Sequence, residues 1–162
     1  MPDFSHLFKR AAGKTAEPYT FPMGLYPGVI SSFSLEEINR PSISKEKVPA
    51  LRIRVIPTGW PDGIPDDQKV HPNPDGVLER VDLSKSAFRS DFPCPNDLSH
   101  NSWFYLDEFI RSCGMDPDGK DYEELFAQLP GQPVMLEMQQ YLNQQTNRIG
   151  NQLGRVFGRN GA

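Results

Sequence analysis

The chain has 162 residues, a length that suits one domain with a real hydrophobic core. Its 16 prolines and 13 glycines favour short strands and loops over long helices. No apolar run approaches the roughly 20 residues of a membrane span, and the first residues lack the apolar core of a signal peptide. Two cysteines provide no disulfide framework, which indicates reduced thiols in a cytoplasmic protein.

The net charge of −4 argues against general adhesion to nucleic acid, but the charges are unevenly distributed. Residues 1–58 carry eight basic and five acidic side chains, and residues 128–162 carry three and one. The middle of the chain is acidic. An anionic partner is therefore compatible with one face of an acidic protein.

Residues 1–22 are predicted to form an N-terminal arm. Phe4, Leu7 and Phe8 have helical spacing, and the glycine and prolines that follow interrupt any helix. This segment is either a partly ordered terminus or an arm that docks on a neighbouring subunit or on DNA phosphates.

Two strands are expected next, over residues 23–33 and 48–57. Pro27 and Gly28 suit a bulge or an edge position in the first of them. In the second, alternation places Arg52 and Arg54 on the face opposite the apolar side chains. Two guanidiniums at this spacing suit successive phosphates, although solvated charges on an exposed strand face explain them equally well.

Residues 58–76 are rich in Pro, Gly and Asp and predict a long surface loop. Trp60 in this loop is either packed against the domain or offered to a base for stacking. Residues 77–83 are expected to form a third strand. Lys85, Phe88 and Arg89 follow as a basic and aromatic cluster on a turn, with Phe88 in the core or available for stacking.

Helices are predicted over residues 103–113, with Gly114 as the C-cap, and over residues 121–128. A hairpin follows at 129–158. Its first strand alternates apolar and polar residues, its turn lies at 143–147, and its second strand contains spaced glycines. Tyr141 is expected on the polar face of this hairpin, together with Arg148 and Arg155. The glycines either admit a close neighbour or mark bends in the strand.

The predicted fold class is mainly β with α. The expected order is three strands, a helix and two strands, which is the order of the OB-fold, a five-stranded Greek-key barrel with a helix between strands three and four. The expected OB-fold-like domain covers residues 23–158, with the long loop at 58–76 and a short tail at 159–162. Such barrels bind oligonucleotides on a strand face and the adjoining loops.

Four sequence stretches extend this interpretation: GLYPGVI, ALRIRV, LDEFIRSCGMD and LPGQPVMLEMQQYLNQQTNRIGNQLGRVF. Together, over residues 23–158, the chain resembles small bacteriophage OB-fold proteins that bind single-stranded DNA. The resemblance implies that the protein binds DNA exposed during phage replication or recombination, in the cytoplasm of the infected bacterial host. It also implies possible partners among replication or recombination proteins and copies of the same chain, and none in a membrane.

No catalytic motif is present. The sequence lacks a phosphate-binding loop and a nucleophile elbow, and the adjacent Asp107 and Glu108 point in different directions on the predicted helix. His6, His71 and His100 are scattered and do not form a zinc pattern. We therefore expect no enzymatic activity, no cofactor and no metal.

The leading hypothesis is a protein that binds single-stranded DNA with little sequence specificity. Such binding needs cations for phosphates and aromatic faces for bases. The candidate residues are Arg52, Arg54, Trp60, Lys85, Phe88, Arg89, Tyr141, Arg148 and Arg155. The alternative is a non-enzymatic phage structural or assembly protein that uses the barrel and the arm for protein contacts. The acidic net charge favours this alternative, and the strand arginines favour DNA.

Overall fold

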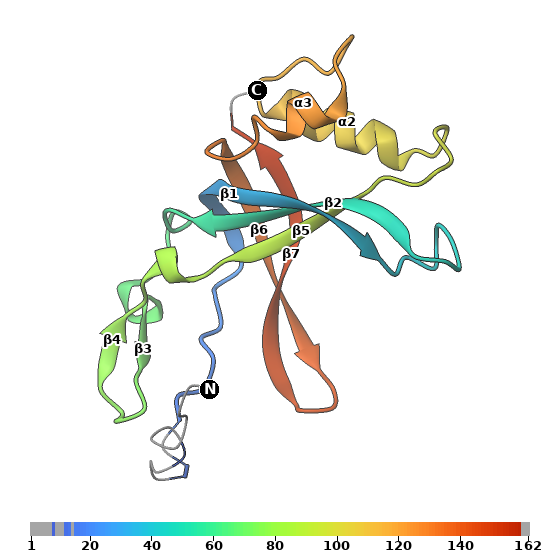
Figure 1. The fold of residues 1–162 in the computed structure, drawn as a ribbon. Coiled ribbons are helices and arrows are strands. Elements are labelled where there is room, and N and C mark those ends of the chain that lie inside the picture. Colours follow the sequence, from blue (N-terminus) through green and yellow to red (C-terminus); the bar gives the residue numbers. More distant parts are fainter. Residues whose placement is uncertain (1–7, 9–11, 14, 160–162) are drawn as a thin grey trace.

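The computed structural model describes residues 8, 12–13 and 15–159. The predicted positions of Phe4, Leu7 and His6, and the last three residues of the predicted tail, lie outside the described residues. The protein is mainly β, with a five-stranded antiparallel sheet in the order β5–β2–β1–β6–β7 (Figure 1). Its strands are β1 (Gly24–Ile38), β2 (Val48–Pro57), β5 (Phe88–Pro93), β6 (Pro133–Asn143) and β7 (Arg148–Gly158).

The remaining elements are short. A two-stranded hairpin consists of β3 (Val70–Pro72) and β4 (Leu78–Arg80), flanked by the 3-10 helices η1 (Asp66–Gln68) and η2 (Leu83–Lys85). The helices α2 (Ser102–Ser112) and α3 (Tyr122–Phe126) connect β5 to β6. Figure 1 shows both helices on one side of the sheet, while the β3–β4 and β6–β7 hairpins extend away from them.

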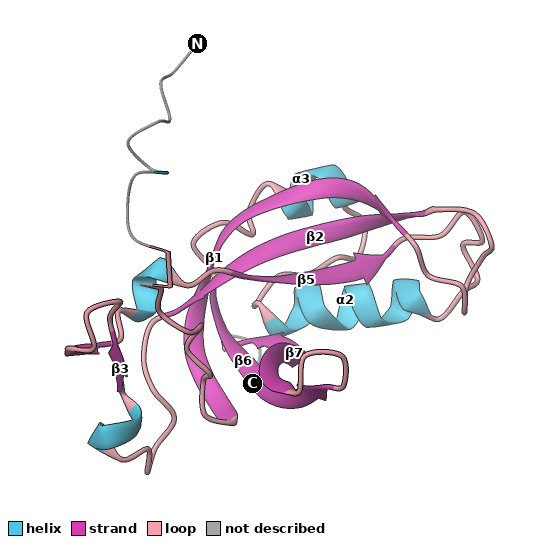
Figure 2. Ribbon diagram, turned by 90° about the horizontal axis from the view of Figure 1, so that it is seen from below, coloured by secondary structure: helices cyan, strands magenta, loops and turns pink. Residues whose placement is uncertain are grey.

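The predicted sheet and its intervening helix are confirmed, but the closed barrel is not. Across the described residues no strand pairing joins β5 to β7, so the sheet has two free edges. Helix α2 packs across both of these edge strands. Figure 2 shows α2 running alongside β5.

The third strand of the sheet was predicted in the wrong place. Residues 77–83 contain β4 of the small hairpin and the first residue of η2. The strand beside β2 is Phe88–Pro93, whose first two residues are predicted on a turn with Lys85. The alternation in FRSDFP explains why this segment forms a strand of the sheet. Phe88 and Phe92 pack against the core, while Arg89 and Asp91 occupy the opposite positions.

Strand β1 is central, which corrects the expectation of an edge position. Pro27 is tolerated because its carbonyl accepts a hydrogen bond from Thr58 N at 2.8 Å, just beyond the last pair of the β1–β2 ladder. The Pro27 nitrogen also points toward β2. Because the β1–β2 ladder has ended at this position, no carbonyl of the ladder needs an N–H donor from residue 27. The bulge in β1 lies further on, between Ile30 and Ser32.

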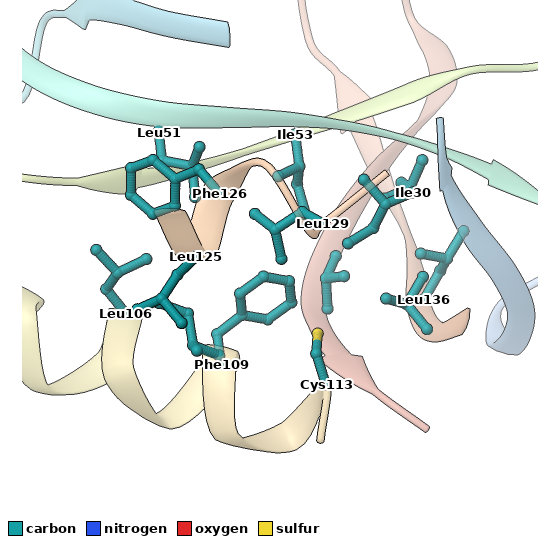
Figure 3. Packing of buried hydrophobic residues seen from close by; sticks show 14 of the residues in the cluster. Ile30, Leu51, Ile53, Leu106, Phe109, Cys113, Leu125, Phe126, Leu129 and Leu136 are labelled. Atoms are coloured by element: carbon teal, nitrogen blue, oxygen red, sulfur yellow. The ribbon is translucent and has the colours of Figure 1, made fainter. Parts of the chain in front are cut away.

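The core lies between the sheet and the two helices. Figure 3 shows Leu51 and Ile53 of β2 facing Phe109 of α2 and Leu125 of α3. Residues 106, 109, 110 and 113 have the spacing of one helix face and are all buried. Phe104, two residues before Leu106, is exposed because two residues along a helix correspond to a turn of about 200°.

The end of the predicted arm is fixed to the hairpin. The side-chain amide of Asn151 accepts a hydrogen bond from Phe21 N at 2.7 Å and donates to Phe21 O at 3.0 Å. Gln140 Nε2 also donates to Phe21 O, at 2.9 Å. Tyr19 and Phe21 also pack against the hydrophobic core, so this end of the segment is held against the sheet.

Two of the three glycines of β7, Gly154 and Gly158, are explained by a bulge and by a close contact with α2. Gly154 lies at a β-bulge, which supports the interpretation as a bend. At Gly158 an added Cβ would lie 2.2 Å from the carbonyl oxygen of Ser112. The Gly158 N–H also donates to Ser112 Oγ at 2.8 Å, so only glycine lets β7 approach the end of α2 this closely.

Candidate nucleic-acid interface

The first group of predicted residues lies on the outer face of β2 and β5. Arg52 is paired in register with Asp91, and Arg54 is paired with Arg89. These side chains point away from the core because the residues between them, such as Ile53, are buried. We call the set Arg52, Arg54, Arg89 and Asp91 the strand face.

Arg52 is held by Asp91. Its Nε donates to Oδ1 at 2.8 Å and its Nη2 donates to Oδ2 at 3.1 Å, which makes a bidentate pair. Both side chains are mostly shielded, with 18% and 16% of their surfaces exposed. The hydrogen bonds to Asp91 raise the pKa of the Arg52 guanidinium, so it remains charged.

Arg54 and Arg89 lie directly opposite each other and are both exposed. Like charges at opposite positions of a strand pair destabilise it. None of the ion pairs found in the described part of the chain involves either residue. An anion bound between them would offset this repulsion.

Two predicted aromatic residues are partly buried and pack against the core. Trp60 contacts Phe21 and Tyr26, with ring centroids 6.5 and 5.9 Å apart, and Phe88 meets Phe21 edge-on at 5.3 Å. For both residues the structure supports core packing over a stacking surface. Lys85, at the end of η2, is exposed near this cluster.

Tyr141 and Arg148 lie near the tip of the β6–β7 hairpin, away from the strand face. The Tyr141 side chain is 45% exposed and its ring lies across Gly150, where an added Cβ would be 2.8 Å from Tyr141 Cζ. Gly150 therefore admits the tyrosine ring. Arg148 is exposed and pairs in register with Asn143 at the turn.

Arg155 lies on β7 beside α2. Its Nη2 is 3.7 Å from Glu108 Oε1, and its guanidinium carbon is 5.2 Å from the centre of the Phe157 ring. The Arg155 and Glu108 side chains are 68% and 51% exposed, so the ion pair is weak. Arg155 is thus positioned by contacts that an anionic ligand could replace.

Two hollows lie where the sheet fails to close. The first, with a volume of about 260 Å³, is bounded by β5, α2 and β7 and includes Asp91, Glu108 and Arg155. The second, of about 580 Å³, lies between α2 and the end of β7 and includes Arg111, Arg155 and Arg159. We call the two together the seam groove, since they share part of their lining.

Neither Asp91 nor the seam groove was predicted from the sequence. Asp91 was not singled out because residues 88–93 were not recognised as a strand. The alternation of Phe88, Ser90 and Phe92 with Arg89 and Asp91 was the signal that could have found it. No sequence pattern reveals that β5 and β7 stay unpaired.

The two cysteines lie in packed positions. Burial raises the pKa of the Cys113 thiol to about 11 and also raises that of Cys94. Thiols with raised pKa values are poor nucleophiles at neutral pH. Within the described residues, no group of three or more His, Cys, Asp or Glu side chains could hold a metal ion.

Comparisons with known proteins assign no family: no protein-family model matches the chain, and no curated protein matches it. Among the described residues, no helix has the length and apolar character needed to cross a membrane.

Proposed function

We propose that the protein binds single-stranded DNA with little sequence specificity and has no catalytic role. The observation that carries this proposal is the exposed pair Arg54 and Arg89, which face each other across β2 and β5 without an acidic partner in the described residues. Arg52 lies beside them. A phosphate backbone provides anions that would relieve this repulsion.

The order of the strands supports the same proposal. Counting only the strands of the main sheet, the order is 3-2-1-4-5, with the helices between the third and fourth. An OB-fold opened between strands three and five has this order. OB-folds bind oligonucleotides on the face of strands two and three, and those strands are β2 and β5 here.

In this mechanism, cations neutralise the backbone while exposed aromatic rings stack on bases. Tyr141 is the predicted aromatic residue with an exposed ring, and base stacking contributes roughly 1–3 kcal/mol per base. Because neither phosphate contacts nor stacking reads a base edge, little sequence preference is expected. The biological role proposed from the resemblance is to keep DNA unpaired during phage replication or recombination in the host cytoplasm.

The test is a fluorescence anisotropy titration of labelled oligo-dT and of a matched duplex at two salt concentrations. The double variant Arg54→Ala, Arg89→Ala should bind less tightly to every sequence. Its salt slope should become shallower by about 1.4, since each phosphate contact on a single strand contributes about 0.7. The control Arg80→Ala, Lys120→Ala removes the same charge from exposed positions elsewhere. Lack of single-strand binding by the wild type at low salt would refute the proposal.

Assembly through protein contacts is the second candidate function, and a different surface favours it. A largely apolar hollow of about 380 Å³ lies between β2 and the helices and is lined in part by Trp103 and Tyr122. Leu35 and Leu98 border it and are 70% and 77% exposed. An apolar hollow with exposed leucines at its border suits an apolar side chain of a partner protein. Sedimentation of the wild type and of a Leu35→Ser, Leu98→Ser variant over a range of concentrations tests self-association through this surface.

A further inference from the structure

The seam groove adjoins the strand face. Asp91 belongs to both, because it holds Arg52 on the strand face and also lines the first hollow of the groove. From there the lining passes along α2 to Arg155, which borders both hollows. A ligand on the strand face would thus meet the seam groove at the free edge of β5.

The charges of the wider hollow of the groove suit a polyanion. Its wider hollow is bordered by Arg111, Arg155 and Arg159, together with the single carboxylate Glu108. Arg111 is engaged by Asp118 at 3.0 Å. Arg155 has only the longer contact of 3.7 Å with Glu108, and no ion pair found in the described residues involves Arg159. Two guanidiniums are therefore available for phosphates.

We propose that a single-stranded polynucleotide leaves the strand face at Asp91 and continues through the seam groove, where Arg155 and Arg159 contact its phosphates. This inference rests on the proposed function and adds a path and a second set of contacts to it. Glu108 competes with the phosphates for Arg155 and so weakens binding. The open seam between β5 and β7 then has a role, since pairing of these two strands would close the route.

The contribution of Glu108 gives the sharpest test. Glu108→Gln removes the competing charge with little change in shape, so affinity for a long oligo-dT should rise about two- to fivefold, the range of an exposed ion pair. Glu123→Gln is the matched control, because it removes the same charge from an exposed position on α3, outside the groove. Equal affinities of the two variants would overturn the proposed path.

The affinity for oligonucleotides of increasing length tests the same path independently of Glu108. For the wild type, affinity should continue to rise with length after the strand face is filled. For Arg155→Ala, it should level off at a shorter length, and the salt slope should become shallower by about 0.7. A wild-type length dependence in the variant would refute the path and leave the strand face as the binding site. Failure of the wild type to bind any single strand would instead refute the proposed function itself. Far-ultraviolet circular dichroism confirms that each variant is folded.

Discussion

The hydrogen bonds between Asn151 and Phe21 provide a quantitative test of how the N-terminal segment is held. The amide makes three hydrogen bonds: from Phe21 N at 2.7 Å, to Phe21 O at 3.0 Å and to Gln139 O at 3.2 Å. Asn151→Ala removes all three and leaves the Phe21 N–H without this acceptor in a partly buried site. With about 0.5–1.5 kcal/mol net for each of the three hydrogen bonds, we expect a loss of about 2–4 kcal/mol.

Urea unfolding followed by circular dichroism measures this loss. The melting temperature should fall by about 5–15 °C, since 1 kcal/mol shifts it by roughly 2–4 °C in a domain of this size. Because Phe21 packs near Trp60, release of the segment should also shift the tryptophan emission to longer wavelength. The control is Gln152→Ala on the same strand, which removes one exposed contact of 3.5 Å. If Asn151→Ala were within about 0.5 kcal/mol of this control, the segment would not depend on Asn151.

Further predictions follow from the packing around α2. Gly158→Ala should destabilise the protein by about 1–3 kcal/mol in the same urea assay, because the added Cβ would overlap the Ser112 carbonyl. In the comparison variant Gly63→Ala the added Cβ meets no atom within 4 Å, so this variant shows only the backbone effect of alanine at a positive φ. The alkylation rate of Cys113 by iodoacetamide should rise with pH toward about 11, above the ordinary thiol value of 9.0, and a half-point near 9 would contradict its burial. The pKa of the Cys113 thiol is higher in the folded than in the unfolded chain, so its contribution to stability is fully present below pH 9 and is lost as the pH rises toward 11. Cys113→Ala should therefore reduce the loss of stability over that range.

The parts of the fold with regular alternation were predictable from sequence. The β6–β7 hairpin, β2 and the buried face of α2 follow from periods of two and 3.6 residues, which burial imposes on strands and helices. The strand Phe88–Pro93 was missed because it is short and ends in proline, and because Phe88 and Arg89 were grouped with Lys85 as a turn. Its place was decided by pairing with β2, a contact about 40 residues away in the sequence.

The features of the predicted binding residues were likewise predictable where they follow from local alternation and not where they depend on distant contacts. Local alternation correctly placed Arg52 and Arg54 on the outer face of β2. It did not reveal that Asp91 holds Arg52, or that Trp60 packs among aromatic side chains from before and within β1. Both depend on long-range contacts, which a single sequence does not encode in any local pattern.

The attachment of Phe21 to Asn151 also bears on the order in which the protein is made. The two residues are 130 positions apart, and β1 needs both β2 and the late strand β6 as neighbours. During synthesis one side of β1 stays unpaired until β6, which begins at Pro133, has left the ribosome. Folding dominated by such distant contacts is slow, and an unpaired strand is prone to aggregate. A ribosome-bound chain that ends before β6 would thus be the form most dependent on chaperones.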